Sequence, residues 1–365
     1  MEYTRKIVTE DGKEYYGYGF GSDVERVCEL VFNTSMVGYQ EIISDPSYTY
    51  QAVVMSYPLI GNYGIADDDY ESDGAKLGAL IVREYNDEPS NFRAKETLDA
   101  VLKRYDIPGI EGVDTRMIVR SIRNLGSRKV LITSADKDLK TCLDIINRTE
   151  IKKDAVSTVS SKEKKEYPAN KNKFINIVAI DCGMKSNIVR RMQDKGLNVT
   201  VVPYNTSAEE ILGLKPDGVF ISNGPGDPTD VPKTIETVKK LHSKVPIFGI
   251  CLGLQILALS YGAKTYKLKF GHRGGNHPVK NLKTGKIEIT SQNHSYAVKE
   301  DSIIDDTLKV THINLLDNTI EGIECEKDFA FAVQYHPESA PGPQDSDYLF
   351  DVFVENIMRF NKINA

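Results

Sequence analysis

The hydrophobic positions in the second half of the chain follow two alternating periods. Apolar runs rich in β-branched residues, typical of buried parallel strands, lie at 174–180, 197–202, 218–221 and 245–250. Between them, apolar residues recur at helical spacing over 187–195 and 235–241, and Ser207 with Glu210 forms a capping box that opens another helix. A last helical pattern covers 348–360. Strands that alternate with helices predict a doubly wound, mostly parallel α/β sheet.

The first 150 residues follow a different pattern, which predicts a β-rich α+β domain. Strand-like runs separated by Gly-rich turns favour a mostly antiparallel sheet, and they lie at 6–8, 14–18 and 26–32. Helical patterns come later, near 97–105 and 116–124. The GYGFG run at 17–21 resembles a dinucleotide-binding loop, but no capped helix follows it where that fold needs one. A β-rich turn is therefore the favoured interpretation of this run.

A polar segment separates the two patterns. Ten of the 22 residues in 152–173 are charged, and serine and asparagine fill much of the rest. Such a segment buries too little apolar surface to offset its ordering entropy, which favours a linker or exposed loop over a polar surface helix. We therefore expect an N-terminal domain over 1–151, a linker over 152–173 and a C-terminal domain over 174–365.

Length, charge and cysteine content exclude several classes of protein. The 365 residues exceed what one hydrophobic core usually holds. The 46 basic and 52 acidic residues give a net charge of −6, which argues against nucleic-acid binding by counterion release. No apolar run approaches the roughly 20 residues of a membrane span, and the first residues lack a signal-peptide pattern, so we expect a cytoplasmic protein. Five scattered cysteines without CxxC spacing fit neither a disulfide framework nor a zinc site.

The most informative segment is FGICLGLQ at 248–255, where a predicted strand leads into Cys251 and a helix follows. Gly249 and Gly253 suit the crowded backbone of a sharp strand-to-helix elbow. The elbow places the thiol at the carboxyl edge of the sheet, where open α/β folds bind ligands. It also places the sulfur at a helix N-terminus, which favours the thiolate. The alternative is a small apolar cysteine that ends a core strand, but the two glycines favour the elbow.

Two further segments supply partners for a thiolate. His336 ends another apolar strand, and Glu338, two residues on, shares its face and can fix the imidazole tautomer. Alone, this His-Pro-Glu turn is better explained by a satisfied surface histidine, and only together with the cysteine elbow does it become specific. The string SNGPGDP at 222–228 follows a strand and predicts a rigid turn with exposed backbone amides, suited to a substrate carbonyl or carboxylate. It is not a phosphate loop, because the chain contains no GxxxxGK[ST] string.

Three further histidines, His272, His277 and His294, invite comparison with a metal site. Their spacings of five and seventeen residues, without a companion cysteine or carboxylate pattern, fit no common metal site. We expect these histidines to hydrogen-bond loops near the active site, and we expect no metal on this chain.

The three catalytic segments, in this order, resemble the class I glutamine amidotransferases, whose pattern is G-x-C-x-G-x-Q followed by H-P-E. Longer strings look like the small chain of carbamoyl-phosphate synthase: FNTSMVGYQ at 32–40, DPSY at 45–48, YPLIGN at 57–62, GVDTR at 112–116 and FGHRGGNHP at 270–278. The resemblance covers nearly the whole chain, domain order included.

The resemblance implies roles for individual residues. Cys251 would be the nucleophile, His336 the general base and then acid, and Glu338 its orienting partner. The backbone N–H groups of Leu252 and Gly224 would form the oxyanion hole. The residues implied to hold glutamine are Ser47, which would reach across from the N-terminal domain, and Gly226, Gln255, Asn293, Ser295 and Tyr296.

Two places depart from the family pattern. Leu254 stands where the family often has histidine, and Ser295-Tyr296 stands where it often has Gly-Phe. Backbone contacts tolerate a change from glycine to serine if the dihedral angles allow it. The roles of Ser295 and Tyr296 toward glutamine rest on this tolerance.

The resemblance implies a subunit that hydrolyses L-glutamine through a cysteinyl thioester and passes ammonia to a large synthetase chain. We expect no cofactor on this chain, ATP and Mg²⁺ on the large chain, docking of that chain by the N-terminal domain, and neither a nucleic-acid nor a membrane partner. One alternative is another hydrolase on the same scaffold, such as a γ-glutamyl peptidase; a second is a non-catalytic regulatory subunit. The sequence leaves open whether the product serves arginine or pyrimidine synthesis, and whether small–large pairs form higher oligomers.

Overall fold

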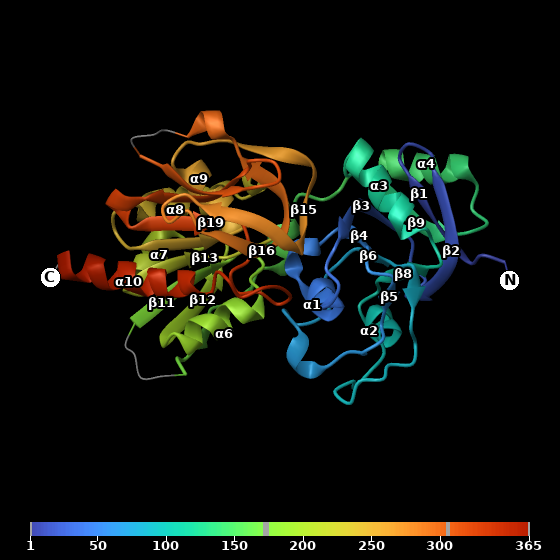
Figure 1. The fold of residues 1–365 in the computed structure, drawn as a ribbon, viewed down its shortest axis with the longest axis horizontal. Coiled ribbons are helices and arrows are strands. Elements are labelled where there is room, and N and C mark those ends of the chain that lie inside the picture. The colour runs from blue at the N-terminus through green and yellow to red at the C-terminus, as the bar shows by residue number, and fades with distance from the viewer. Residues whose placement is uncertain (1, 171–174, 304–306, 364–365) are drawn as a thin grey trace. The chain divides into compact units, whose positions relative to one another are not determined.

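The computed structural model describes residues 2–170, 175–303 and 307–363. The chain divides into two compact units, Met1–Lys153 and Asp154–Ala365, each with its own hydrophobic core (Figure 1). No helix in the described ranges is both long enough and apolar enough to cross a membrane.

The first unit is built on a closed barrel with the strand order β1-β2-β8-β6-β4-β3-β9. Its strands are β1 (Arg5–Thr9), β2 (Glu14–Gly21), β3 (Arg26–Asn33), β4 (Gln51–Met55), β6 (Ala79–Ile81), β8 (Pro108–Glu111) and β9 (Lys129–Ser134). Within the described residues, four of the pairings are antiparallel and three, β3–β4, β4–β6 and β6–β8, are parallel. The prediction of a mostly antiparallel sheet missed the parallel part and the closure, because the strand-like runs that we recognised end at residue 32.

Shorter elements complete the first unit. They are α1 (Tyr39–Ser44), the 3-10 helices η1 (Pro46–Tyr48) and η2 (Asp67–Asp69), the strand pair β5 (Leu59–Ile60) and β7 (Glu84–Tyr85), α2 (Leu98–Arg104), α3 (Thr115–Leu125) and α4 (Leu139–Arg148). The two predicted helices correspond to α2 and α3, whose first turns are capped by Thr97 and Asp114. The GYGFG run lies inside β2, so it is part of a strand rather than a dinucleotide loop or a turn.

The second unit holds a ten-stranded sheet in the order β10-β12-β11-β13-β14-β19-β18-β17-β15-β16. The five parallel strands are β12 (Leu197–Pro203), β11 (Ile175–Asp181), β13 (Gly218–Ile221), β14 (Ile247–Ile250) and β19 (Ala330–Val333). The antiparallel strands are β10 (Lys165–Tyr167) at one edge and β18 (Ile320–Cys325), β17 (Lys309–Asn314), β15 (Thr265–Asn281) and β16 (Ile287–Val298) toward the other. The parallel strands correspond to the predicted α/β pattern, and the antiparallel extension adds to it.

Helices cover both faces of the sheet, as a doubly wound fold requires (Figure 1). Apolar side chains of α6 (Ser186–Asp194) and α10 (Tyr348–Ile363) pack into one core cluster. Those of α7 (Ala208–Gly213), α8 (Pro232–Leu241) and α9 (Leu252–Ser260) pack into the other. In α10 the predicted apolar face is buried at Phe350, Phe353 and Ile357, whereas Phe360 is half-buried.

The polar segment 152–173 is more ordered than its composition suggested. It contains α5 (Ala155–Val159), whose Val156 joins a core cluster, and β10, which pairs antiparallel with β12. An edge strand tolerates charged residues because one of its sides meets solvent. Residues 171–173 lie outside the described residues.

The strand order places the ligand-binding edge of the second unit. From β12 the chain crosses over β11 to reach β13, so the connections after β11 and β13 diverge at the carboxyl ends of these neighbouring strands. In open α/β sheets, ligands bind at such a switch point. The loops after β11, β13, β14 and β19 meet at this edge.

Candidate active site

Cys251 forms a strained elbow between β14 and α9. Its φ of 56° and ψ of −104° are rare for any residue other than glycine. A Cβ on Gly249 would lie 2.8 Å from the carbonyl carbon of Gly253, and one on Gly253 would lie 2.3 Å from the carbonyl oxygen of Ile221. Both glycines are therefore required by backbone contacts, as the elbow hypothesis proposed. The thiol at this elbow is buried, with 2% of Cys251 exposed.

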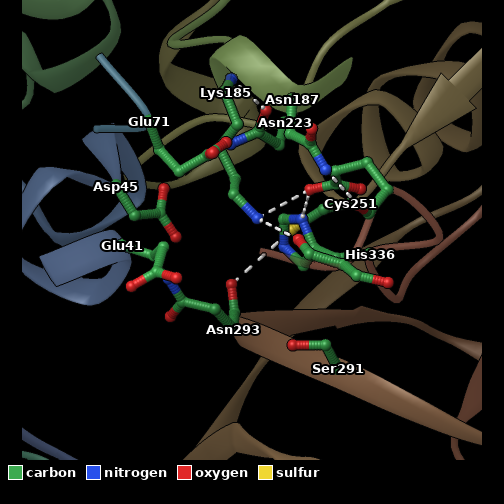
Figure 2. Close-up of polar contacts among 12 residues, drawn as sticks. Glu41, Asp45, Glu71, Lys185, Asn187, Asn223, Cys251, Ser291, Asn293 and His336 are labelled. Carbon is green, nitrogen blue, oxygen red and sulfur yellow. Dashed lines mark hydrogen bonds and ion pairs between the residues drawn. The ribbon is translucent and has the colours of Figure 1, made fainter. Parts of the chain in front are cut away.

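His336 and Glu338 form a buried pair beside the sulfur. Nδ1 of His336 lies 2.7 Å from Oε1 of Glu338, which assigns the Nδ1 proton to this hydrogen bond. Nε2 of His336 has no hydrogen-bond partner among the residues that the structure describes, and Figure 2 shows the imidazole next to the sulfur of Cys251. The sulfur itself donates to the backbone carbonyl of Asn293 at 3.6 Å.

The electrostatics of the pair favour its charged form. Burial works to lower the pKa of His336, but the Glu338 carboxylate and the Cys251 thiol outweigh burial and raise it. Burial likewise works to raise the pKa of Glu338, but the charges of Lys185 and His336 outweigh it, so the carboxyl stays well below its ordinary range. An imidazolium is the form that pairs with a thiolate and then protonates a leaving amine.

Lys185 completes this charged group, and the sequence analysis missed it. The residue is 3% exposed, and Nζ donates to Oε1 of Glu338 at 2.9 Å and to the carbonyl of Ser339 at 2.8 Å. The backbone N–H of Lys185 donates to Oδ1 of Asn223, and Asn187 donates to the carbonyl of Glu338. The sequence signal that could have indicated Lys185 was its place a few residues after a predicted strand, because β11 ends at the ligand-binding edge of the sheet.

The two predicted oxyanion donors lie close together. Leu252 is the first residue of α9, so its N–H is among those that a helix leaves without an internal partner. Gly224 follows β13, and a Cβ there would meet the Cys182 carbonyl oxygen at 2.2 Å and the Leu252 side chain at 2.9 Å. Gly226, in the same turn, has a φ of +87° that favours glycine. Their roles toward substrate stay predictions.

Two of the predicted glutamine-holding residues in the second unit contact each other, and Ser295 contacts an arginine. Nε2 of Gln255 donates to the Tyr296 carbonyl at 2.9 Å, and Oγ of Ser295 accepts from Nη2 of Arg273 at 2.5 Å. The serine that departs from the family pattern thus has a partner of its own. Asn293, on the same strand, accepts from the Cys251 sulfur through its carbonyl.

Two further positions from the sequence analysis are described by their own surroundings. Leu254, where the family often has histidine, is fully buried in a core cluster. Ser47 belongs to the first unit, in η1, where its backbone N–H donates to Oδ1 of Asp45 at 2.9 Å. Its contact with the glutamine pocket stays a prediction.

The three histidines predicted to lie near the site take part in a buried network with carboxylates. His272, His294 and Glu321 bring ligand atoms within 4.8 Å of one another. However, Nε2 of His272 lies 2.8 Å from Asp317, and Nδ1 lies 3.6 Å from Glu321. These two carboxylates outweigh burial and raise the pKa of His272 to about 9, which favours the protonated ring in this network. His294 donates toward the Tyr296 carbonyl at 2.8 Å, which fits the expected role near the site.

Comparison with known proteins assigns both units. Residues 178–356 match the family model for class-I glutamine amidotransferases, and residues 7–132 match that for the carbamoyl-phosphate synthase small chain, CPSase domain. The carbamoyl phosphate synthase small chain of Fusobacterium nucleatum is 52% identical over 355 residues, 97% of this chain and 98% of that protein. The chain belongs to the carbamoyl-phosphate synthase small-chain family.

Other members of this family are equally similar. The small chain of Staphylococcus epidermidis is 51% identical over 358 residues, 98% of this chain and 97% of that protein. The pyrimidine-specific small chain of Bacillus subtilis is 51% identical over 353 residues, 97% of this chain and 96% of that protein. The family resemblance drawn from the sequence strings is thus confirmed along nearly the whole chain.

Proposed function

We propose that this chain is the glutaminase subunit of a glutamine-hydrolysing carbamoyl-phosphate synthase. It hydrolyses L-glutamine to glutamate and ammonia and delivers the ammonia to a large synthetase chain. The observation that carries the proposal is the buried elbow thiol beside an imidazole whose other nitrogen is held by a carboxylate. Family membership across both units supports the large chain as the partner.

The first half-reaction forms a thioester. The thiolate of Cys251 attacks the side-chain amide carbon of glutamine, and the backbone N–H groups of Leu252 and Gly224 receive the developing oxyanion. As the C–N bond breaks, Nε2 of the His336 imidazolium donates its proton to the leaving nitrogen. The products of this half are ammonia and a γ-glutamyl thioester on the sulfur.

The second half-reaction restores the enzyme. His336, now neutral, takes a proton from water, whose oxygen attacks the thioester carbon. The C–S bond breaks, glutamate leaves and the thiolate faces an imidazolium again. Glu338, fixed by Lys185, holds Nδ1–H throughout, so Nε2 remains the nitrogen that moves protons.

The large chain carries out the remaining steps of carbamoyl phosphate synthesis in this proposal. In this proposal ATP and Mg²⁺ bind the large chain, where ammonia is converted to carbamoyl phosphate. The first unit carries none of the residues of the Cys251 elbow and is proposed to dock that chain.

Replacing the nucleophile tests the proposal. In complex with the large chain, Cys251→Ser is expected to abolish glutamine-dependent synthesis and to leave ammonia-dependent synthesis intact. The matched control is Cys325→Ser, because this buried cysteine pairs with Ala330 at the opposite end of β19. Equal loss of both activities in the Cys251 variant, or full glutamine-dependent activity, would contradict the proposal. Faster hydrolysis of γ-glutamyl peptides than of glutamine by the wild type would favour the peptidase alternative.

A further inference from the structure

The amide of Gln255 is held in one orientation by two acceptors. This side chain is 2% exposed and lies one helical turn after the nucleophile. Its Nε2 donates to the Tyr296 carbonyl at 2.9 Å and to Oε1 of Gln334 at 3.1 Å. A backbone carbonyl can only accept, so the contact with Tyr296 decides which end of the amide is nitrogen.

This orientation leaves one polar atom for a ligand. A glutamine amide has two N–H donors and one carbonyl acceptor, and both donors of Gln255 are engaged. Its Oε1 has no partner among the residues that the structure describes. An amide oxygen binds only hydrogen-bond donors. In free glutamine the charged donor away from the reacting amide is the α-ammonium group.

Gln334 provides the second acceptor, and its own amide nitrogen is left without a partner among the described residues. It follows β19, two residues before His336, and its side chain is fully buried. Its backbone N–H donates to the carbonyl of Glu321 at 2.9 Å. With Oε1 turned to Gln255, its Nε2 has no hydrogen-bond partner in the described part of the chain. A buried amide N–H without a partner is unfavourable. Its presence at Gln334 indicates that the hydrogen bond from Gln255 determines the orientation of the Gln334 amide.

We infer that Gln334 is a positioning residue for substrate recognition: it fixes the Gln255 amide so that Oε1 accepts a hydrogen bond from the α-ammonium group of glutamine. The inference deepens the proposed glutaminase function and rests on it. Gln334 acts through Gln255 and touches neither the reacting amide nor the sulfur. The pair therefore contributes to the choice of substrates that carry a free α-amino group.

The test compares two substrates and three glutamine variants in the complex with the large chain. The substrates are L-glutamine and glutaramic acid, which has the same amide and carboxylate but no amino group. The variant is Gln334→Leu, which removes the acceptor at similar size. The control is Gln292→Leu, because Gln292 is equally buried on β16 of the same sheet but donates to Thr290 and Glu321 instead of Gln255.

We expect Gln334→Leu to raise KM for L-glutamine by about tenfold with a smaller effect on kcat, since one hydrogen bond to a charged group is lost. The preference for L-glutamine over glutaramic acid should shrink by a similar factor, and the pH profile of kcat should keep its shape. Gln334→Glu retains an acceptor for Nε2 of Gln255 and should restore most of the preference.

An unchanged substrate preference in Gln334→Leu, or an equal loss of preference in Gln292→Leu, would overturn the inference. A shifted pH profile of kcat with an unchanged KM would also overturn the inference, because it would mean that Gln334 acts on the protonation of His336 and not on substrate binding. Absence of any glutaminase activity in the wild-type complex would instead refute the proposed function.

Discussion

The ammonium group of Lys185 and the carboxylate of Glu338 form a buried ion pair, with Nζ 2.9 Å from Oε1, the same oxygen that contacts Nδ1 of His336 at 2.7 Å. One carboxylate oxygen thus receives two cationic donors in a site shielded from water. The lysine offsets the burial of Glu338 and keeps it ionised, and the ionised Glu338 in turn keeps His336 protonated. The charge of His336 is therefore set partly by a residue from another loop.

Breaking this pair should be costly. Lys185→Met leaves Glu338 buried without its ammonium partner, and we expect the free energy of unfolding to fall by about 3–5 kcal/mol. Turnover with glutamine should fall as well, because the pKa of Glu338 rises and His336 loses its anionic partner. Urea unfolding and glutaminase assays at pH 7 measure the two effects.

The matched control for this prediction is Lys195→Met. Lys195 also pairs with two carboxylates, Asp347 at 3.0 Å and Asp351 at 2.7 Å, but it is partly exposed. Such pairs contribute about 0–1 kcal/mol, so this variant should keep nearly all its stability and activity. Equal destabilisation by both substitutions would contradict the special role of the buried pair.

The charged pair also predicts how stability depends on pH. The pKa of Glu338 lies below its ordinary 4.5 in the folded chain, so its contribution is complete above pH 4.5 and is lost as the pH falls. The pKa of His336 lies above its ordinary 6.5, so its contribution is complete below pH 6.5 and is lost as the pH rises. The wild type should therefore exceed Glu338→Gln in stability most strongly between pH 4.5 and 6.5.

Unfolding curves of both proteins across the pH range measure this difference. A difference that does not vary with pH would mean that Glu338 contributes packing rather than charge. Kinetics give a second readout, because Glu338→Gln keeps a hydrogen-bonding shape but weakens the imidazolium. Its kcat should fall more than its KM rises.

Local strings predicted the nucleophile, its base and the orienting carboxylate, because each lies within a few residues of the strand end that positions it. Lys185 could not be found in this way. It is separated from Glu338 by 153 positions, and the two meet only because β11 and β19 belong to one parallel sheet. The carboxylates around His272 were missed for the same reason, since Asp317 and Glu321 come from a distant part of the chain. The barrel closure was missed because short strands such as β6 leave little pattern to read.

The elbow makes a steric prediction. A Cβ on Gly253 would approach the Ile221 carbonyl oxygen to 2.3 Å, so Gly253→Ala must displace α9 or β13. Overpacking of this kind costs about 1–3 kcal/mol, and the displaced thiol should lose most of its glutaminase turnover. Gly213→Ala is the control, because nothing lies within 4 Å of a Cβ there. Similar behaviour of the two variants in unfolding and turnover assays would refute the steric requirement.

Coupling between the two chains forms a separate prediction. Glutaminase turnover of the lone chain should be slow and should rise when the large chain and its nucleotide are added, because unregulated hydrolysis would waste glutamine. Couplings of this type typically change affinities about 5–150-fold. Ser47→Ala should reduce turnover in the complex if the first unit lends this residue to the pocket. Unchanged turnover on addition of the large chain would contradict docking-coupled activity.

The central claim is that Cys251 is the nucleophile for the glutamine amide, and labelling with an electrophilic glutamine analogue tests it most directly. A chloroketone in place of the amide should alkylate the sulfur at the rate at which glutamine-dependent activity disappears, and excess L-glutamine should slow both. Peptide mass analysis is predicted to find one label per chain, on Cys251, with Cys28, Cys142, Cys182 and Cys325 unmodified because all four are buried outside the elbow. A label on another residue, or full glutamine-dependent activity in chains labelled at Cys251, would contradict the account.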